Sequence, residues 1–212
     1  MSMSNLLIFG KASTGLEIFE VARRYYNFFF DSILFVIGNH ETKDEPNQIF
    51  DSELESFCKE NDCKYIISFS NNSIRLKTEL LMKNLDVSAF TIIHPSAIIS
   101  DTAKIDSGNY IAANVVISSY AQLIGTNIVN YNSTIGHHSI INGHCIINPG
   151  ARISGNVFLG RSCLVGSNSF LFQGITIGQN SIIDALTHVD KDLSEKMIAS
   201  SKNIKIFKRV IL

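Results

Sequence analysis

Three histidines with the chemistry of a reactive site lie close together in the second half of the sequence. His137 and His138 are adjacent, and His144 follows after five intervening residues. An imidazole can accept a proton near neutral pH, so one of them could act as a general base, and imidazole nitrogens also bind zinc. Each could equally lie on a solvated loop. The elements that carry these residues must decide between the three interpretations.

The histidines lie within a strict repeat of six residues. From Ile93 onward every sixth residue is aliphatic without an insertion: Ile99, Ile105, Ile111, Ile117, Leu123, Val129, Ile135, Ile141, Ile147, Ile153, Leu159, Val165, Leu171, Ile177, Ile183 and Val189. A period of six fits neither a helix nor a half-buried strand, and it is typical of a hexapeptide solenoid. We therefore expect residues 91–192 to form a triangular solenoid in which residues eighteen apart stack at about 4.8 Å.

Small residues two positions before the aliphatic ones suit the tight corners of such a prism. Two of them, Cys145 and Cys163, are eighteen apart and should be stacked neighbours in the core. A chain with four cysteines, no zinc-ligand spacing and no secretory signal has no disulfide framework. We expect all four thiols to be free.

Residues 1–90 follow a different pattern. Short apolar runs alternate with helical patterns, with strands expected near 6–9, 33–38 and 65–70 and helices near 15–26, 52–61 and 73–85. This order builds a parallel sheet with crossover helices and predicts a small Rossmann-like α/β domain. The turn after the first strand contains Gly10 and Gly15 and could hold an anion at a helix N-terminus, or it could simply permit a tight turn.

Composition and charge indicate which classes of binding partner the protein is expected to lack. The chain has 212 residues, 45% of them hydrophobic and 17% charged, with a formal net charge of −1. No run of like charges indicates nucleic-acid binding, and no apolar stretch approaches the roughly 20 residues that span a bilayer. No signal peptide is recognisable. We therefore expect a soluble cytoplasmic protein with no nucleic-acid or membrane partner.

Four stretches together resemble the bacterial sugar acyltransferases of the NeuD and PglD group. They are the opening IFGKASTG, the junction IIHPSAII, the unbroken hexads and the segment STIGHHSIINGHCIINPGARISGNVFLG, so the resemblance covers nearly the whole chain. It implies a left-handed parallel β-helix after the Rossmann-like domain, followed by a C-terminal tail over residues 193–212. It also implies a homotrimer, with acetyl-CoA between neighbouring β-helices and a nucleotide-linked amino sugar on the N-terminal domain.

The resemblance assigns the catalytic role to the histidine pair. The base of the family stands about twelve residues before Pro-Gly, and His137 has this spacing to Pro149 and Gly150. Many relatives carry Asp or Glu after the base to orient it, whereas this chain has His138. We group both histidines as catalytic and expect a carboxylate from a neighbouring subunit or a backbone carbonyl to orient His137.

The remaining site residues are also carried over from the family by position. For coenzyme A they are Gly155, whose backbone N–H would face the thioester carbonyl, with Ile146 and Gly166. For the sugar nucleotide they are Gly10, Ser13, Gly15, Asn39 and Asn130. Asn39 stands where a nucleotide binder often presents an acidic residue, and the tail lacks the glycine-x-proline-alanine element of the family.

Three functional classes stay open from the sequence. The first is an acetyl-CoA-dependent transferase acting on an amino or hydroxyl group of a nucleotide-linked amino sugar or nonulosonic acid for surface polysaccharide. The second is a β-helix binding or scaffold protein with weak or no activity. The third is a metal-dependent hydratase like the solenoid carbonic anhydrases. It is disfavoured, because one pair of metal-binding histidines in those enzymes has four residues between them, whereas six separate His137 from His144 and five separate His138 from His144. We therefore expect no metal.

Overall fold

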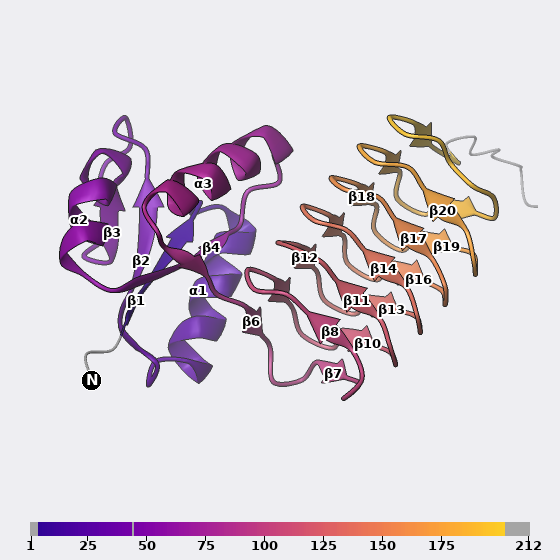
Figure 1. Ribbon diagram of the computed structural model, residues 1–212, viewed down its shortest axis with the longest axis horizontal. Helices are drawn as coiled ribbons and strands as arrows, with labels where there is room; N and C mark the ends of the chain where they lie inside the picture. Colours follow the sequence, from indigo (N-terminus) through magenta and orange to yellow (C-terminus); the bar gives the residue numbers. More distant parts are fainter. Residues whose placement is uncertain (1–3, 44, 202–212) are drawn as a thin grey trace, which may run out of the picture.

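Two parts with different architectures follow each other in the computed structural model, which describes residues 4–43 and 45–201. An α/β part lies at one end of the molecule, and a stack of triangular coils extends away from it (Figure 1). In the part of the chain that the structure describes, no helix is long and apolar enough to cross a membrane.

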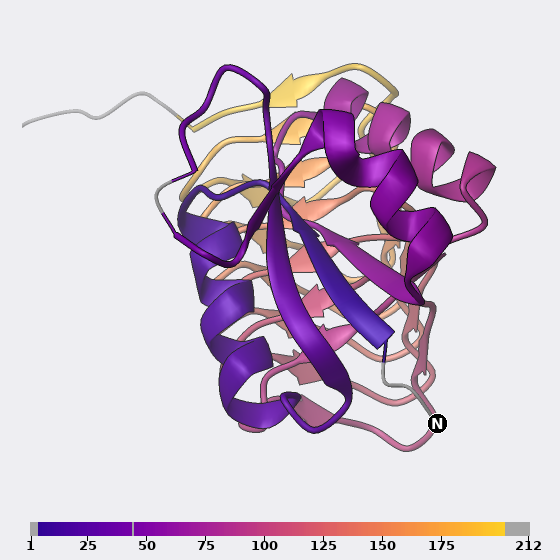
Figure 2. The ribbon, with the colours of Figure 1, turned by 90° about the vertical axis from the view of Figure 1, so that its left-hand side faces the viewer.

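The N-terminal part is built on a five-stranded parallel sheet in the order β3-β2-β1-β4-β5. Its strands are β1 (Ser4–Phe9), β2 (Phe30–Ile37), β3 (Gln48–Phe50), β4 (Cys63–Ile67) and β5 (Ser88–Ala89). Helix α1 (Ser13–Tyr25) packs on one face, while α2 (Leu54–Glu60), which follows the short 3-10 helix η1 (Asp51–Glu53), and α3 (Asn72–Asn84) pack on the other (Figure 2). The predicted alternation of parallel strands and crossover helices is present, and the chain order reverses between β1 and β4.

Beyond Phe90 the chain winds into a prism with three parallel sheets. The first face contains β6 (Ile92–Ile93), β9 (Tyr110–Ile111), β12 (Ile128–Val129), β15 (Ile146–Ile147), β18 (Leu164–Val165), β21 (Ile182–Ile183) and β23 (Ile198–Ala199). The second contains β7 (Ile98–Ile99), β10 (Val116–Ile117), β13 (Thr134–Ile135), β16 (Arg152–Ile153), β19 (Phe170–Leu171) and β22 (His188–Val189). The third contains β8 (Lys104–Ile105), β11 (Gln122–Leu123), β14 (Ile140–Ile141), β17 (Phe158–Leu159) and β20 (Thr176–Ile177).

The solenoid predicted from the repeat is confirmed. Each aliphatic residue of the six-residue series is the second residue of a strand, and strands pair in a register of eighteen residues, as Ile117 does with Ile135. Successive parallel strands stacked in this way fit a left-handed β-helix. Many corners contain a residue in the left-handed conformation, most often asparagine, as at Asn114, Asn132 and Asn156 with φ of 58° to 60°.

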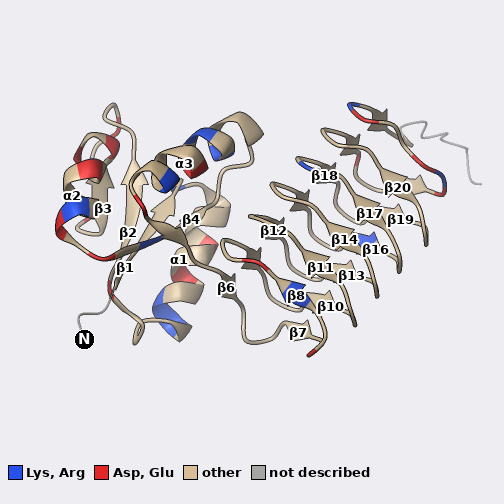
Figure 3. Ribbon diagram, viewed as in Figure 1, with Lys and Arg blue, Asp and Glu red and all other residues tan. Residues whose placement is uncertain are grey.

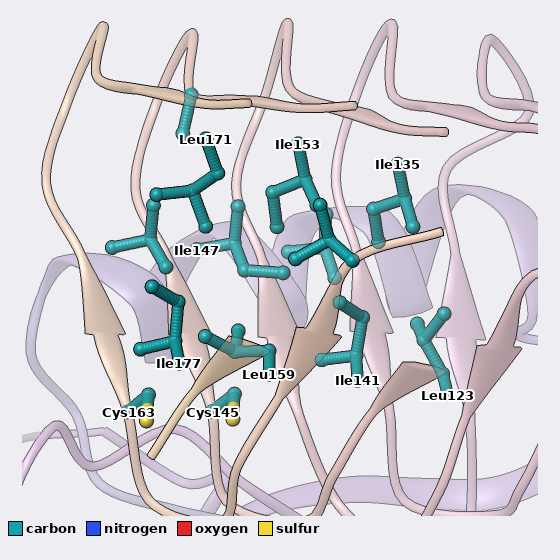
Figure 4. Packing of buried hydrophobic residues seen from close by; sticks show 14 of the residues in the cluster. Leu123, Ile135, Ile141, Cys145, Ile147, Ile153, Leu159, Cys163, Leu171 and Ile177 are labelled. Atoms are coloured by element: carbon teal, nitrogen blue, oxygen red, sulfur yellow. The ribbon is translucent and has the colours of Figure 1, made fainter. Parts of the chain in front are cut away.

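The inward side chains form one continuous apolar core (Figure 4). Most are completely buried, as Ile135, Ile147 and Leu159 are, and each such side chain contributes roughly 1.5 to 3 kcal/mol to folding. Cys145 and Cys163 are stacked in this core as free thiols, whose sulfurs lie 3.1 Å from the Gly160 carbonyl oxygen and 3.2 Å from that of Gly178. Cys58 and Cys63 are also free.

The two ends of the β-helix are defined by strand pairing. β5 pairs with β4 in the N-terminal sheet, whereas β6 pairs with β9 in the prism. At the other end β23 lies beyond residue 192 and pairs with β21 at a spacing of sixteen residues, so the last coil includes part of the segment predicted as a tail. The β-helix therefore reaches Ala199, and the partly buried Leu193 and Ala199 of this shortened coil pack against the core. Residues 202–212 of the predicted tail lie outside the described residues.

The N-terminal domain covers one face and one corner of the prism. Outward residues of the first face, including Tyr110, Ile128 and Ile146, pack with Ile18 and Val21 of α1 in one apolar cluster. Helix α3 lies along the corner between the third and first faces, where Asn72 Nδ2 donates to the Ser162 carbonyl oxygen at 3.0 Å and Arg75 Nη2 donates to that of Thr126 at 3.1 Å. The opposite edge, which we call the second–third corner, comprises residues 100–103, 118–121, 136–139, 154–157 and 172–175.

Candidate active site

His137 and His138 form a contacting pair on the second–third corner, directly after β13. Both side chains are exposed, and their Nδ1 atoms are 3.2 Å apart. The rings meet edge to face, with centroids 5.4 Å apart and an interplanar angle of 83°. The contact is possible because His138 adopts a φ of 59°, which turns the chain between the two side chains. The structure therefore joins the two imidazoles into one unit.

Gly155 lies one coil beyond His137 and provides the space for its ring. A Cβ atom built on Gly155 would lie 2.5 Å from both Cε1 and Nε2 of His137, so no side chain fits there while the ring keeps this position. The structure brings Gly155 next to His137, as the resemblance implied. It also adds a steric requirement that sequence reasoning missed.

Tyr120 lies one coil before His138 and was not predicted as a site residue. Its ring stacks on the His138 ring, with centroids 5.0 Å apart and an interplanar angle of 26°. Tyr120 also has a left-handed φ, 60°, so the two residues turn their corners in the same way. The eighteen-residue register was the signal that could have identified Tyr120, because residue 138 must stack on residue 120.

On the second–third corner no acidic residue of the described chain lies one coil before or after His137. The residues stacked one coil before and one coil after the pair are Ser119, Tyr120, Gly155 and Asn156, and the first acidic residue in line is Asp101, two coils before His137. Charged residues are frequent along the N-terminal domain and near the far end of the prism, with few on the coils between them (Figure 3). Among the described residues His137 Nδ1 has one hydrogen-bond partner, His138.

His144 is separate from the pair, as predicted, and belongs to the domain interface. It is 1% exposed on the third–first corner, where its Nε2 lies 2.9 Å from Glu79 Oε2 of α3 and 2.7 Å from Arg161 Nη2. Nε2 cannot both donate to Glu79 and accept from Arg161, so it engages one of them at a time. In the part of the chain that the structure describes, no three His, Cys, Asp or Glu side chains are grouped as metal ligands would be.

Glu79 is held in its charged form by this contact. The hydrogen bond from His144, assisted by the positive charges of Arg161 and Arg75, holds the pKa of the Glu79 carboxyl below its ordinary value despite partial burial. His144 Nδ1 lies 3.1 Å from Thr126 Oγ1, which fixes the other edge of the ring. The third histidine thus fastens α3 to the β-helix.

Three predicted residues lie elsewhere on the prism. Asn130 and Gly166 are on the first–second corner; Asn130 is 8% exposed, and a Cβ on Gly166 would clash with the Ala185 backbone nitrogen. Ile146 faces the N-terminal domain and is 6% exposed. Within one chain the structure does not bring these residues to His137.

The residues predicted to bind the sugar nucleotide lie at the carboxyl edge of the N-terminal sheet. Gly10 has a φ of 101°, and a Cβ on Gly15 would clash with the Gly10 carbonyl oxygen, so the turn between β1 and α1 requires both glycines. Ser13 is exposed at the first position of α1. Asn39 is exposed after β2. A cleft of about 560 Å³ at this edge is lined by Lys11, Ala12, Ile37, Glu41, Thr42 and Gln48.

Comparison of the structure with solved structures finds close likeness over nearly the whole chain. The acetyltransferase domain of PglB from Neisseria gonorrhoeae, also solved with acetyl coenzyme A, matches with a TM-score of 0.82 and 23% identity over 92% of this chain and 95% of its own. A mutant of perosamine N-acetyltransferase from Caulobacter crescentus, solved with CoA and GDP-perosamine, matches with a TM-score of 0.83 and 21% identity over 97% and 99%. WeeI from Acinetobacter baumannii matches with a TM-score of 0.83 and 18% identity over 92% and 96%.

The chain has the fold of these sugar acetyltransferases. The sequence itself matches no protein-family model and no curated protein. The resemblance read from the motifs is therefore confirmed in three dimensions, where the six-residue repeat determines the shape although few residues are identical.

In this chain the sugar acetyltransferase fold separates the predicted site residues into distinct groups. One group, at the edge of the N-terminal sheet, contains the glycine turn and its cleft. Another, on the second–third corner, contains the histidine pair, Gly155 and Tyr120. The N-terminal domain covers the first face and the third–first corner, whereas the histidine pair lies on the edge opposite that face.

Proposed function

We propose that the protein transfers the acetyl group of acetyl-CoA to an amino or hydroxyl group of a nucleotide-linked amino sugar or nonulosonic acid, in the synthesis of surface polysaccharide. The observation that carries the proposal is the exposed ring of His137, seated on Gly155 at a corner of a sugar acetyltransferase fold. Solved proteins of this fold hold acetyl coenzyme A and GDP-perosamine. The cytoplasmic location expected from the sequence stays a prediction.

His137 is the general base in this proposal. The sugar amine or hydroxyl attacks the thioester carbonyl carbon, and its proton passes to Nε2 of His137 as the new bond to carbon forms. The carbon–sulfur bond then breaks, and the departing thiolate takes the same proton from Nε2. The backbone N–H of Gly155 is suited to the negative charge that develops on the carbonyl oxygen between these two steps.

We propose further that the working form is a closed homotrimer. The N-terminal domain packs on the first face of the prism, whereas His137 lies on the edge opposite that face, so in this proposal one chain carries two separate halves of a site. A neighbouring copy can bring its own half to the second–third corner. Exposed apolar residues on the uncovered surface, such as Ile98 at 67% and Phe172 at 51% exposure, are available for contact with that copy.

In such an assembly the first–second corner of a neighbour would supply Asn130 and Gly166 to the sugar and to coenzyme A. Ile146 offers the least surface of the predicted residues, because α1 of its own chain covers it. We keep the contact of Ile146 with coenzyme A as a prediction.

The test is to incubate the purified protein with acetyl-CoA and a panel of nucleotide-linked amino sugars, and to detect the added acetyl group by mass spectrometry. His137→Ala should lower turnover by about 10²- to 10⁴-fold, the usual contribution of a positioned general base, and leave coenzyme A binding unchanged. His188→Ala, which removes another exposed histidine of the prism, is the matched control and should retain activity.

Two results would contradict the proposal. Coenzyme A binding without turnover on any sugar would favour a binding protein, the class that the missing carboxylate at the corner also favours. A bound metal ion in the purified protein, with no transfer of an acetyl group, would favour a hydratase.

A further inference from the structure

We propose that His138, supported by Tyr120, replaces the missing carboxylate: its Nδ1 accepts a hydrogen bond from Nδ1–H of His137 and shares the positive charge that His137 acquires. This inference rests on the proposed function. It makes His138 and Tyr120 positioning residues, which act through His137 and do not contact the reacting atoms.

The contact between the two Nδ1 atoms restricts the protonation of the pair. At 3.2 Å one nitrogen must carry the hydrogen and the other must accept it. If His137 carries the hydrogen on Nδ1, its Nε2 has a free lone pair and can take a proton from the substrate. The reverse arrangement would place the hydrogen on Nε2 of His137 and make it useless as a base. An acceptor Nδ1 on His138, which requires the hydrogen of that ring to lie on Nε2, therefore selects the reactive tautomer of His137.

The charges around the pair favour the same arrangement, in which Nδ1–H of His137 donates to Nδ1 of His138. The groups stacked on the pair from the coils directly before and after it are Ser119, Tyr120, Gly155 and Asn156, and none of them carries a negative charge; the carboxylate of Asp101 belongs to a position two coils before His137. When His137 gains a proton on Nε2, its Nδ1–H becomes a stronger donor toward His138. The bond between the two rings strengthens as charge develops, which is the stabilisation that an acidic partner would otherwise supply. The proton count is unchanged, since the proton on Nε2 later leaves with the thiolate.

Tyr120 fixes the ring of His138 in the position that makes this bond. The two rings are nearly parallel, and the phenol face is attracted to an imidazole that carries part of a positive charge. Because both residues have a φ near 60°, the stack continues the coil register.

Two substitutions of His138 test its hydrogen-bond acceptor and its aromatic ring separately. His138→Asn keeps an acceptor, since the amide oxygen occupies nearly the place of Nδ1, and asparagine is the residue that the protein itself uses at this left-handed step, as at Asn114, Asn132 and Asn156. His138→Phe keeps an aromatic ring against Tyr120 and removes the acceptor. Tyr120 shows that an aromatic residue fits this conformation, so both variants should fold.

The experiment combines a spectrum with kinetics. Long-range proton–nitrogen correlation spectra of the ¹⁵N-histidine-labelled protein report which nitrogen of His137 carries the hydrogen. We expect Nδ1–H in the native protein and in His138→Asn, and a mixture of tautomers in His138→Phe. We expect kcat to fall by about 10- to 100-fold in His138→Phe with KM unchanged, and to stay within a few-fold in His138→Asn, as for groups that orient a catalytic ligand.

Two results would overturn the inference: a hydrogen on Nε2 of His137 in the native protein, or a His138→Phe variant with the native tautomer and native kcat. Failure of the proposed function looks different, because the spectra are recorded on the free protein. If no sugar is acetylated, the tautomers still decide the role of His138. If acetylation is normal and depends on His137 while the His138 variants are indistinguishable from the native protein, only the inference fails.

Discussion

At the residue scale, a glycine and a histidine one coil apart together define the corner that we propose to be reactive. His137 can lie on the corner only because Gly155 leaves the space that a methyl group would occupy. The same argument extends to His138 and Tyr120, whose contact follows from the register of the coil. On this corner the position of each side chain depends on the residue eighteen positions before or after it in the sequence.

We expect Gly155→Ala to displace the His137 ring outward and to lower kcat strongly while leaving the fold intact. The added methyl group meets the mobile end of a side chain, which can move without disturbing the coil. Gly143→Ala is the matched control, because its Cβ would have 3.6 Å to the nearest atom and should be tolerated. Measurements of kcat and melting temperature for both variants check this, and equal activity of the two would remove the steric role of Gly155.

At the element scale, α3 connects the two domains through polar contacts that its own sequence pattern does not predict. The helix presents Asn72, Arg75 and Glu79 on one face, and all three reach the third–first corner of the prism. The N-cap is local, since the Asn71 side chain accepts hydrogen bonds from the backbone N–H groups of Ser73 and Ile74. The partners on the prism come from residues 50 to 90 positions later in the sequence.

The pH dependence of stability tests this connection. Because the folded state lowers the pKa of Glu79, the charged carboxylate stabilises the fold above its ordinary unfolded value near 4.5, and this stabilisation is lost as the pH falls through the lower folded value. We expect Glu79→Gln to lower the melting temperature at pH 7, and the difference from the native protein to shrink toward pH 3. Glu55→Gln, which removes an exposed carboxylate paired with Lys59, is the control and should change little at either pH.

The elements differ in how far the sequence predicts them. The coils were predictable almost to the residue, because a period of six permits one architecture and fixes which side chains point inward. The last coil was missed beyond residue 192, where the spacing falls from eighteen to sixteen. The burial of His144 could not be read from the sequence, since its environment is made by a helix of the other domain. The histidine pair was identified by resemblance, but its contact depends on the left-handed backbone at His138.

At the scale of the whole molecule, the fold places the two halves of the proposed site on opposite sides of one chain. The N-terminal domain covers the first face of the prism, and the histidine pair lies on the edge farthest from that face. In the proposed trimer, rotation about the symmetry axis would bring the corner of one copy to the N-terminal domain of the next. The proposed assembly would therefore be part of the active site and not only a stabilising contact.

Mixing two inactive variants tests whether the site is shared between copies. His137→Ala removes the base, and Ser13→Glu places a negative charge at the start of α1, where it should repel the phosphates of the sugar nucleotide without weakening the helix. Each variant alone should be inactive. In oligomers assembled randomly from equal amounts of the two, a native corner meets a native N-terminal domain in about one quarter of the sites, so about one quarter of the native activity should return. Coenzyme A release, measured after the two variants are co-expressed, gives the recovered fraction of the native activity.

The control is simple mixing of preformed oligomers, which leaves each variant in its own assembly and should recover no activity. If co-expression recovers no activity although mixed oligomers are present by mass, both halves of the site must come from one chain.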